Sequence, residues 1–173
     1  AESAVVAIDG SSEAKTLDVA LEAIAGAETL VSEGPALNPN KEYAKFLAEK
    51  AKTLTDLRST AIRSYLKKSR LRMTEYLETL GADSDVEAFR TAEASIDTYT
   101  EALKHVQGKQ ALSNKLKAIL AKEQKRIPGK RAKMVKARIS AAFEAAETHM
   151  GILRASQTPE SIEVARESTQ GLA

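Results

Sequence analysis

The chain has 173 residues and a mass of 18.6 kDa, with 26 Lys and Arg residues against 24 Asp and Glu residues. It has no cysteine, which excludes a disulfide framework, a thiolate nucleophile and a cysteine-bound zinc site. No run of about 18 apolar residues occurs, so no transmembrane helix is expected. Aromatic residues are only 4% of the chain and Trp is missing, a composition typical of helices. We therefore expect an all-α fold.

The N-terminal half of the chain is predicted to form a short arm and two helices. Residues 1–10 carry no helical pattern and are assigned to the arm. Apolar residues at helical spacing predict a helix over 11–33, which the breakers Gly34 and Pro35 would end. The second predicted helix spans 39–80 without an internal breaker. At 1.5 Å per residue it would be roughly 60 Å long, so we expect an elongated bundle.

A third helix is predicted over residues 84–126. Ser84 and Glu87 have the spacing of a capping box, in which each side chain accepts a hydrogen bond from a free backbone amide of the first turn. The apolar stripe of this segment changes phase after Gly108. We therefore expect a continuous helix with a bend at that glycine.

The dipeptide of Pro128 and Gly129 is expected to end the third helix and to open a tight turn. A fourth helix is predicted over 129–156 and a fifth over 159–170, the latter beginning at a first-turn proline. Short connections make consecutive helices antiparallel, so the core is an up-down-up bundle flanked by the first and last helices. No repeat or linker divides the chain, which predicts a single domain, 1–173.

Two groups of small or apolar residues are assigned to packing between helices. A small-residue stretch in the first helix permits close approach of a neighbouring helix, with a ligand groove as the alternative: Ala20, Ala23, Ala25, Gly26 and Ala27. The fourth helix carries a stripe that is expected to face the core: Val135, Ile139, Ala142, Ala146, Met150 and Leu153.

Charge is distributed unevenly along the chain. Residues 109–140 hold eleven Lys and Arg against the single acid Glu123, a net charge of +10 that leaves −8 for the remainder. Because a turn at Pro128 would fold this stretch on itself, we expect the cations to gather at one tip and bind a polyanion. The alternative is a solvated tip that keeps the protein soluble. The candidate polyanion-binding residues are Lys122, Lys125, Arg126, Lys130, Arg131, Lys133 and Arg138.

No arrangement of residues points to catalysis. The eight glycines are scattered singly, so neither a dinucleotide-binding turn nor a P-loop is present. A Gly-x-Ser-x-Gly nucleophile elbow and a Glu-x-x-His metal motif are also missing. His105 is predicted to pair with Glu101 on a solvated face, and its face does not converge with that of His149. We expect no metal, no cofactor and no enzymatic activity.

The leading hypothesis is a non-catalytic helical-bundle module that presents a helix face or the basic tip to a protein partner. One alternative is binding of nucleic acid or an anionic membrane through the tip around residues 125–138. Another is a carrier of small apolar ligands in a cavity between helices. The chain starts at Ala1 rather than methionine and lacks cysteine, which favours an extracytoplasmic location. No oligomeric state follows from the sequence.

Overall fold

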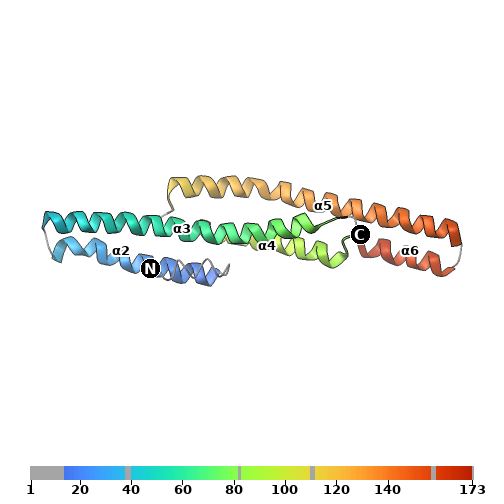
Figure 1. The fold of residues 1–173 in the computed structure, drawn as a ribbon, viewed down its shortest axis with the longest axis horizontal. Helices are drawn as coiled ribbons and strands as arrows, with labels where there is room; N and C mark the ends of the chain where they lie inside the picture. The colour runs from blue at the N-terminus through green and yellow to red at the C-terminus, as the bar shows by residue number, and fades with distance from the viewer. Residues whose placement is uncertain (1–13, 38–39, 82, 110–111, 157–158, 173) are drawn as a thin grey trace. The chain divides into compact units, whose positions relative to one another are not determined.

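The computed structural model describes residues 14–37, 40–81, 83–109, 112–156 and 159–172. These residues form five helices, which are α2 (Ala14–Leu37), α3 (Lys41–Thr79), α4 (Val86–Gln107), α5 (Asn114–Ser156) and α6 (Pro159–Leu172) (Figure 1). Helices account for 93% of the described residues, and no strand occurs among them. The predicted all-α bundle of about five helices is thus confirmed. The predicted arm over 1–10 lies outside the described residues.

The helices contribute to two compact units. Unit 1 comprises the chain up to Arg70 together with Glu101–Leu120, and unit 2 comprises Leu71–Thr100 together with the chain from Ala121 onward. Helices α3, α4 and α5 each supply residues to both units. Since the division runs through continuous helices rather than through a linker, it does not test the predicted single domain.

The core of unit 1 is built from one apolar stripe on each of its helices. Figure 1 shows α2 running antiparallel to the first part of α3. Leu17 and Ile24 of α2, Ile62 of α3 and Leu103 of α4 are almost completely buried. Leu116, in the first turn of α5, is buried in the same unit. Burying one such side chain contributes about 1.5–3 kcal/mol, so these stripes supply the main attraction between the helices.

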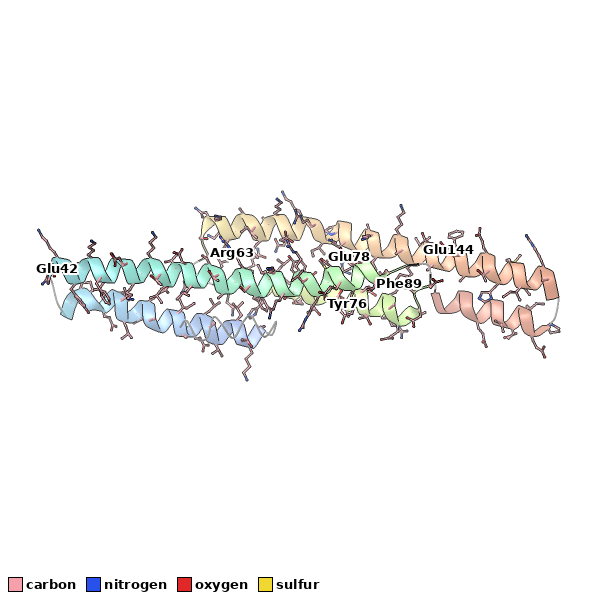
Figure 2. All side chains as sticks on the ribbon, viewed as in Figure 1. Glu42, Arg63, Tyr76, Glu78, Phe89 and Glu144 are labelled. Atoms are coloured by element: carbon pink, nitrogen blue, oxygen red, sulfur yellow. The ribbon has the colours of Figure 1, made fainter. Side chains whose placement is uncertain are left out.

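The core of unit 2 draws on the end of α3, the first part of α4 and the middle of α5. Met73, Phe89 and Ile96 are buried there, and Met134 and Ala141 of α5 pack against the same region. Phe89 and Glu144, both labelled in Figure 2, mark the buried interior and the exposed surface of this unit. Ala141 is the last buried hydrophobic residue of the described part of the chain.

Two helix ends differ from the predictions for local chemical reasons. Helix α2 continues through Gly34 and Pro35 to Leu37, so the predicted stop at these residues is wrong. A Cβ atom at Gly34 would lie only 2.7 Å from Leu47 Cδ1, which indicates that this glycine serves close packing of α2 on α3. Asn40 caps α3, because its Oδ1 accepts a hydrogen bond from the amide of Glu42 at 2.9 Å.

The predicted capping box at the start of the third helix is also wrong. The cap of α4 is Asp85, whose Oδ1 accepts a hydrogen bond from the amide of Ala88 at 2.8 Å. The hydroxyl of Ser84 instead accepts a hydrogen bond from the backbone amide of Gly81, three residues earlier in the turn, at 2.9 Å. The helix therefore begins at Val86, two residues later than predicted.

The predicted helix over 84–126 is two helices. Helix α4 ends at Gln107, and α5 begins at Asn114. Gly108 donates its amide to the carbonyl of Lys104 at 3.0 Å, which finishes the last turn of α4 rather than bending a longer helix. The hydroxyl of Ser113 accepts a hydrogen bond from the amide of Leu116 at 3.3 Å and caps the new helix. The phase shift of the apolar stripe after Gly108 thus corresponds to the end of one helix and the start of another, not to a bend in a single helix.

The predicted turn at Pro128 and Gly129 is the largest error. Helix α5 passes through both residues as one helix of 43 residues, so the predicted helices 84–126 and 129–156 do not exist as such. The side chain of Ile127 is buried and anchors this part of α5 in the unit 2 core. Tertiary burial thus outweighs the weak helix propensity of the dipeptide. Without the turn, the cations are spread along one helix and form no tip.

The predicted core stripe over 135–153 of α5 is also wrong, because the structure does not bury its members. Of its members, Val135, Ile139 and Met150 are exposed. Ala142, Ala146 and Leu153 are only partly covered. Periodicity shows that apolar residues share a helix face, but it does not show whether the fold supplies a neighbour for that face.

Candidate functional site

A charged network lies in unit 1 where α2 meets the end of α4. Asp18 of α2 contacts His105 Nε2 at 2.9 Å and Lys109 Nζ at 2.6 Å. The Tyr65 ring stands edge-on to the His105 ring, with the centroids 6.4 Å apart. The predicted solvated pair of His105 with Glu101 is therefore wrong, because Glu101 binds Lys104 at 2.8 Å. The sequence carried no sign of Asp18, which is 87 residues away in the chain.

The network changes the acidity of two of its members. Burial by itself raises the pKa of Asp18, but hydrogen bonds from Lys109 and His105, and then their charges, lower the pKa below its ordinary value. Burial raises the pKa of the Tyr65 hydroxyl, and the negative charge of Asp18 raises it further. Asp18 is thus an ionised acceptor that ties α2 to the end of α4.

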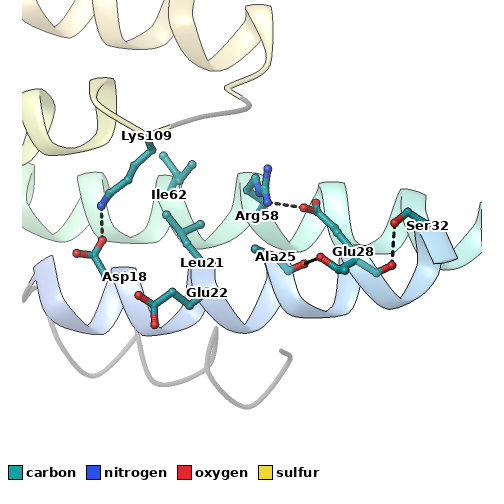
Figure 3. A pocket seen from close by; sticks show the side chains of 10 residues that line it. Asp18, Leu21, Glu22, Ala25, Glu28, Ser32, Arg58, Ile62 and Lys109 are labelled. Carbon is teal, nitrogen blue, oxygen red and sulfur yellow. Dashed lines mark hydrogen bonds and ion pairs between the residues drawn. The ribbon is translucent and has the colours of Figure 1, made fainter.

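A groove of about 630 Å³ runs along α2 beside this network. Figure 3 shows Lys109 reaching Asp18 at one end of the groove and Arg58 reaching Glu28 farther along. The Nε of Arg58 is buried and has no hydrogen-bond partner among the described residues. The groove is lined by Asp18, Leu21, Glu22, Ala25, Glu28, Thr29, Ser32, Arg58, Ile62 and Lys109. Such a charged lining does not suit the apolar ligand considered above.

The single acid of the basic stretch has a structural place in unit 2. Glu123 is buried, and its Oε2 accepts a hydrogen bond from the Tyr99 hydroxyl at 2.8 Å. Its Oε1 accepts a hydrogen bond from Arg126 Nη1 at 2.6 Å. Glu123 therefore connects α4 with α5, and Arg126 has a partner besides any polyanion.

The seven predicted polyanion contacts all lie on α5 within unit 2, but they do not share one face. Lys122, Lys125 and Lys133 are exposed and fall within about 80° of one another at 100° per residue. Arg131 and Arg138 lie on the opposite flank, about 170° away. Arg131 is bonded to Asp97 of α4. Arg126 and Lys130 complete the set, the first exposed and the second partly covered.

An exposed apolar surface occupies another side of α5, and it was missed as a site because its pattern resembles that of a core stripe. Val135, Ile139, Phe143 and Met150 are 47%, 53%, 67% and 49% exposed. Successive members are four, four and seven residues apart, so they fall within about 80° around the helix. We call these four residues, with Ala142 and Ala146 beside them, the α5 face. Contiguous apolar surfaces of this kind are uncommon on soluble monomeric proteins.

A groove of about 470 Å³ borders the α5 face. Its lining combines α5 with one acidic residue of α4: Glu93, Met134, Val135, Arg138, Ile139, Ala142 and Phe143. The groove lies within unit 2 and is mostly apolar, with Glu93 and Arg138 as its charged residues. This shape can receive an apolar side chain from another molecule.

Comparisons with protein-family models, curated proteins and solved structures find no match for this chain. In the part of the chain that the structure describes, no helix has the length and apolar character needed to span a bilayer. The described residues also contain no group of three or more His, Cys, Asp or Glu side chains that could hold a metal ion.

Proposed function

We propose that the protein is a non-catalytic interaction module that binds a protein partner through the α5 face. The observation that carries this proposal is the exposure of Val135, Ile139, Phe143 and Met150 along one line of a helix. Removing each of these side chains from water on binding contributes about 25 cal/mol per Å² of apolar surface. A helix of a partner, laid along this line, would bury all four at once.

The last part of unit 2 supports the same proposal. Beyond Ala141, α5 and α6 bury no hydrophobic side chain among the described residues. On α6, Ile162 and Val164 are also exposed. Isolated helices of about 12–15 residues are marginal in water, and most helices in proteins owe their stability to tertiary packing. A partner that covers the α5 face would supply packing that the described segments of the chain do not provide.

Site-specific photo-crosslinking tests the proposal. A benzophenone amino acid replaces Phe143 in the full chain, which is then irradiated in its native cell. We expect covalent adducts with one defined protein, identified by mass spectrometry. The same substitution at Leu30 of α2, which is 70% exposed and outside the α5 face, is the control. Equal labelling at the two positions, or labelling of lipid alone at position 143, would refute the proposal.

Polyanion binding is a second candidate function. It is supported by Lys122, Lys125 and Lys133, which are exposed on one side of α5. Replacing all three by Glu is expected to shorten retention on heparin at low salt. A matched triple replacement of the exposed Lys41, Lys45 and Lys52 on α3 is the control, since it changes the net charge equally. Equal retention of the two triple variants would exclude a specific basic surface.

A further inference from the structure

The positions of the charged residues along one flank of the α5 face indicate which kind of molecule covers the face. Lys136 and Glu147 are both exposed, and neither has an ion-pair partner in the described part of the chain. They are eleven residues apart, so at 100° per residue they lie on the same flank of the face, about 20° apart. A cation thus stands near one end of the apolar line, and an anion stands near the other end of the same flank.

This arrangement of one cation and one anion is complementary to the same arrangement on a second, antiparallel copy of the helix. When two identical helices pack antiparallel about a two-fold axis, the same flank of each copy faces the other copy. An axis midway between positions 136 and 147 places Lys136 of each copy opposite Glu147 of the second copy. It also places the two most exposed side chains of the α5 face, Ile139 and Phe143, next to the axis, where they pack on the second copy.

The other pairing direction is disfavoured by the same charges. In a parallel pair, the flank that carries Lys136 would face the flank that carries Arg138, so two cations would meet at the same height. Like charges placed side by side repel, whereas the antiparallel pair gains two ion pairs. Glu147 lies beside the line, and its charge opposes contact with an anionic membrane.

We infer that the partner bound by the α5 face is a second copy of this chain, paired antiparallel about a two-fold axis. The inference rests on the proposed function and names the occupant of the same face. The groove that Glu93 and Met134 line beside this face offers a pocket for an apolar side chain of the second copy. An isologous contact of this kind closes after two copies and does not extend into fibres.

Sedimentation velocity of the full chain over a range of concentrations tests this inference with two charge reversals. Wild type is expected to dimerise reversibly. Lys136→Glu and Glu147→Lys are each expected to weaken the dimer roughly tenfold or more, because each places two pairs of like charges together. An equimolar mixture of the two variants is expected to regain wild-type affinity, since the heterodimer again has two ion pairs, one as in the wild type and one with its charges exchanged. Lys45→Glu, on α3, controls for the change in net charge.

The outcomes separate this inference from the proposed function. A wild-type chain that stays monomeric at every concentration would overturn the inference, and so would a mixture no tighter than either variant alone. Circular dichroism of both variants establishes that the exposed substitutions leave the fold intact. If position 143 crosslinks to a different protein while the chain is monomeric, the proposed function stands and the second copy is excluded. If it crosslinks to no protein, the proposed function itself fails.

Discussion

Replacing Pro128 by Ala should stabilise the protein. Pro128 lies fourteen residues inside α5, is exposed, and cannot donate the backbone hydrogen bond to the carbonyl of Gln124 that a helix requires at this position. Alanine restores that donor and removes the steric conflict of the ring with the preceding turn. Gly129 offers a second gain, because a Cβ atom there would meet nothing within 4 Å. Its replacement by Ala reduces the conformational entropy lost on folding without a clash.

The magnitudes follow from helix propensities. Proline in a helix interior costs about 3 kcal/mol relative to alanine, and glycine costs about 1 kcal/mol. We therefore expect Pro128→Ala to raise the free energy of unfolding by up to about 3 kcal/mol, and Gly129→Ala by about 0.5–1 kcal/mol. Urea denaturation followed by far-ultraviolet circular dichroism measures both values. The urea dependence of the unfolding free energy should stay unchanged, since the fold is the same.

The opposite result is what a tight turn would give. In a turn, Pro128 supplies a favourable backbone angle and Gly129 supplies conformational freedom, so both substitutions would lower stability. Gly34→Ala is the matched comparison, because its new Cβ would lie within 3 Å of Leu47. It should therefore be less favourable than Gly129→Ala. A loss of stability in both Pro128→Ala and Gly129→Ala would refute a continuous α5.

Three further results are expected. Leu103→Ala, at a fully buried position, should lower the unfolding free energy by about 2–5 kcal/mol, whereas Leu30→Ala on the surface should change it by less than about 0.5 kcal/mol. Tyr99→Phe should cost about 1.5–3 kcal/mol in the same assay, because buried Glu123 loses a hydrogen-bond donor. The pKa of Asp18 in the folded protein lies below its ordinary value of 3.8. Ionised Asp18 therefore stabilises the fold above pH 3.8, and this contribution should disappear as the pH falls through the pKa of the folded state. In acid titrations of stability, Asp18→Asn should show a shallower loss; an unchanged slope would contradict this assignment.

Most of the helical content could be predicted because it depends on local properties. Apolar residues at helical spacing predicted helices over 11–33, 39–80 and 84–126, and the structure buries Leu17, Ile62 and Leu103 within these ranges. The helix ends were less predictable, since they depend on single hydrogen bonds. Asp85 rather than Ser84 caps α4, and the sequence offers both side chains for the same purpose.

The candidate site shows the opposite balance. Its residues were visible in the sequence, but the apolar line through Ile139 and Met150 was assigned to the core. The bond between Asp18 and His105 joins residues that no local pattern relates. Lys136 and Glu147 can be placed on the same flank only because α5 is a continuous helix between them.

The sequence by itself determined that this chain is helical, which segments carry an apolar stripe, and that cations concentrate in its second half. These properties follow from composition and from spacing along one helix, which short-range sterics and hydrogen bonding control. Only the tertiary structure decided that Pro128 lies within a helix and that the described residues leave the α5 face exposed. Both outcomes depend on the burial of side chains by distant segments, and this burial is large enough to override local preference.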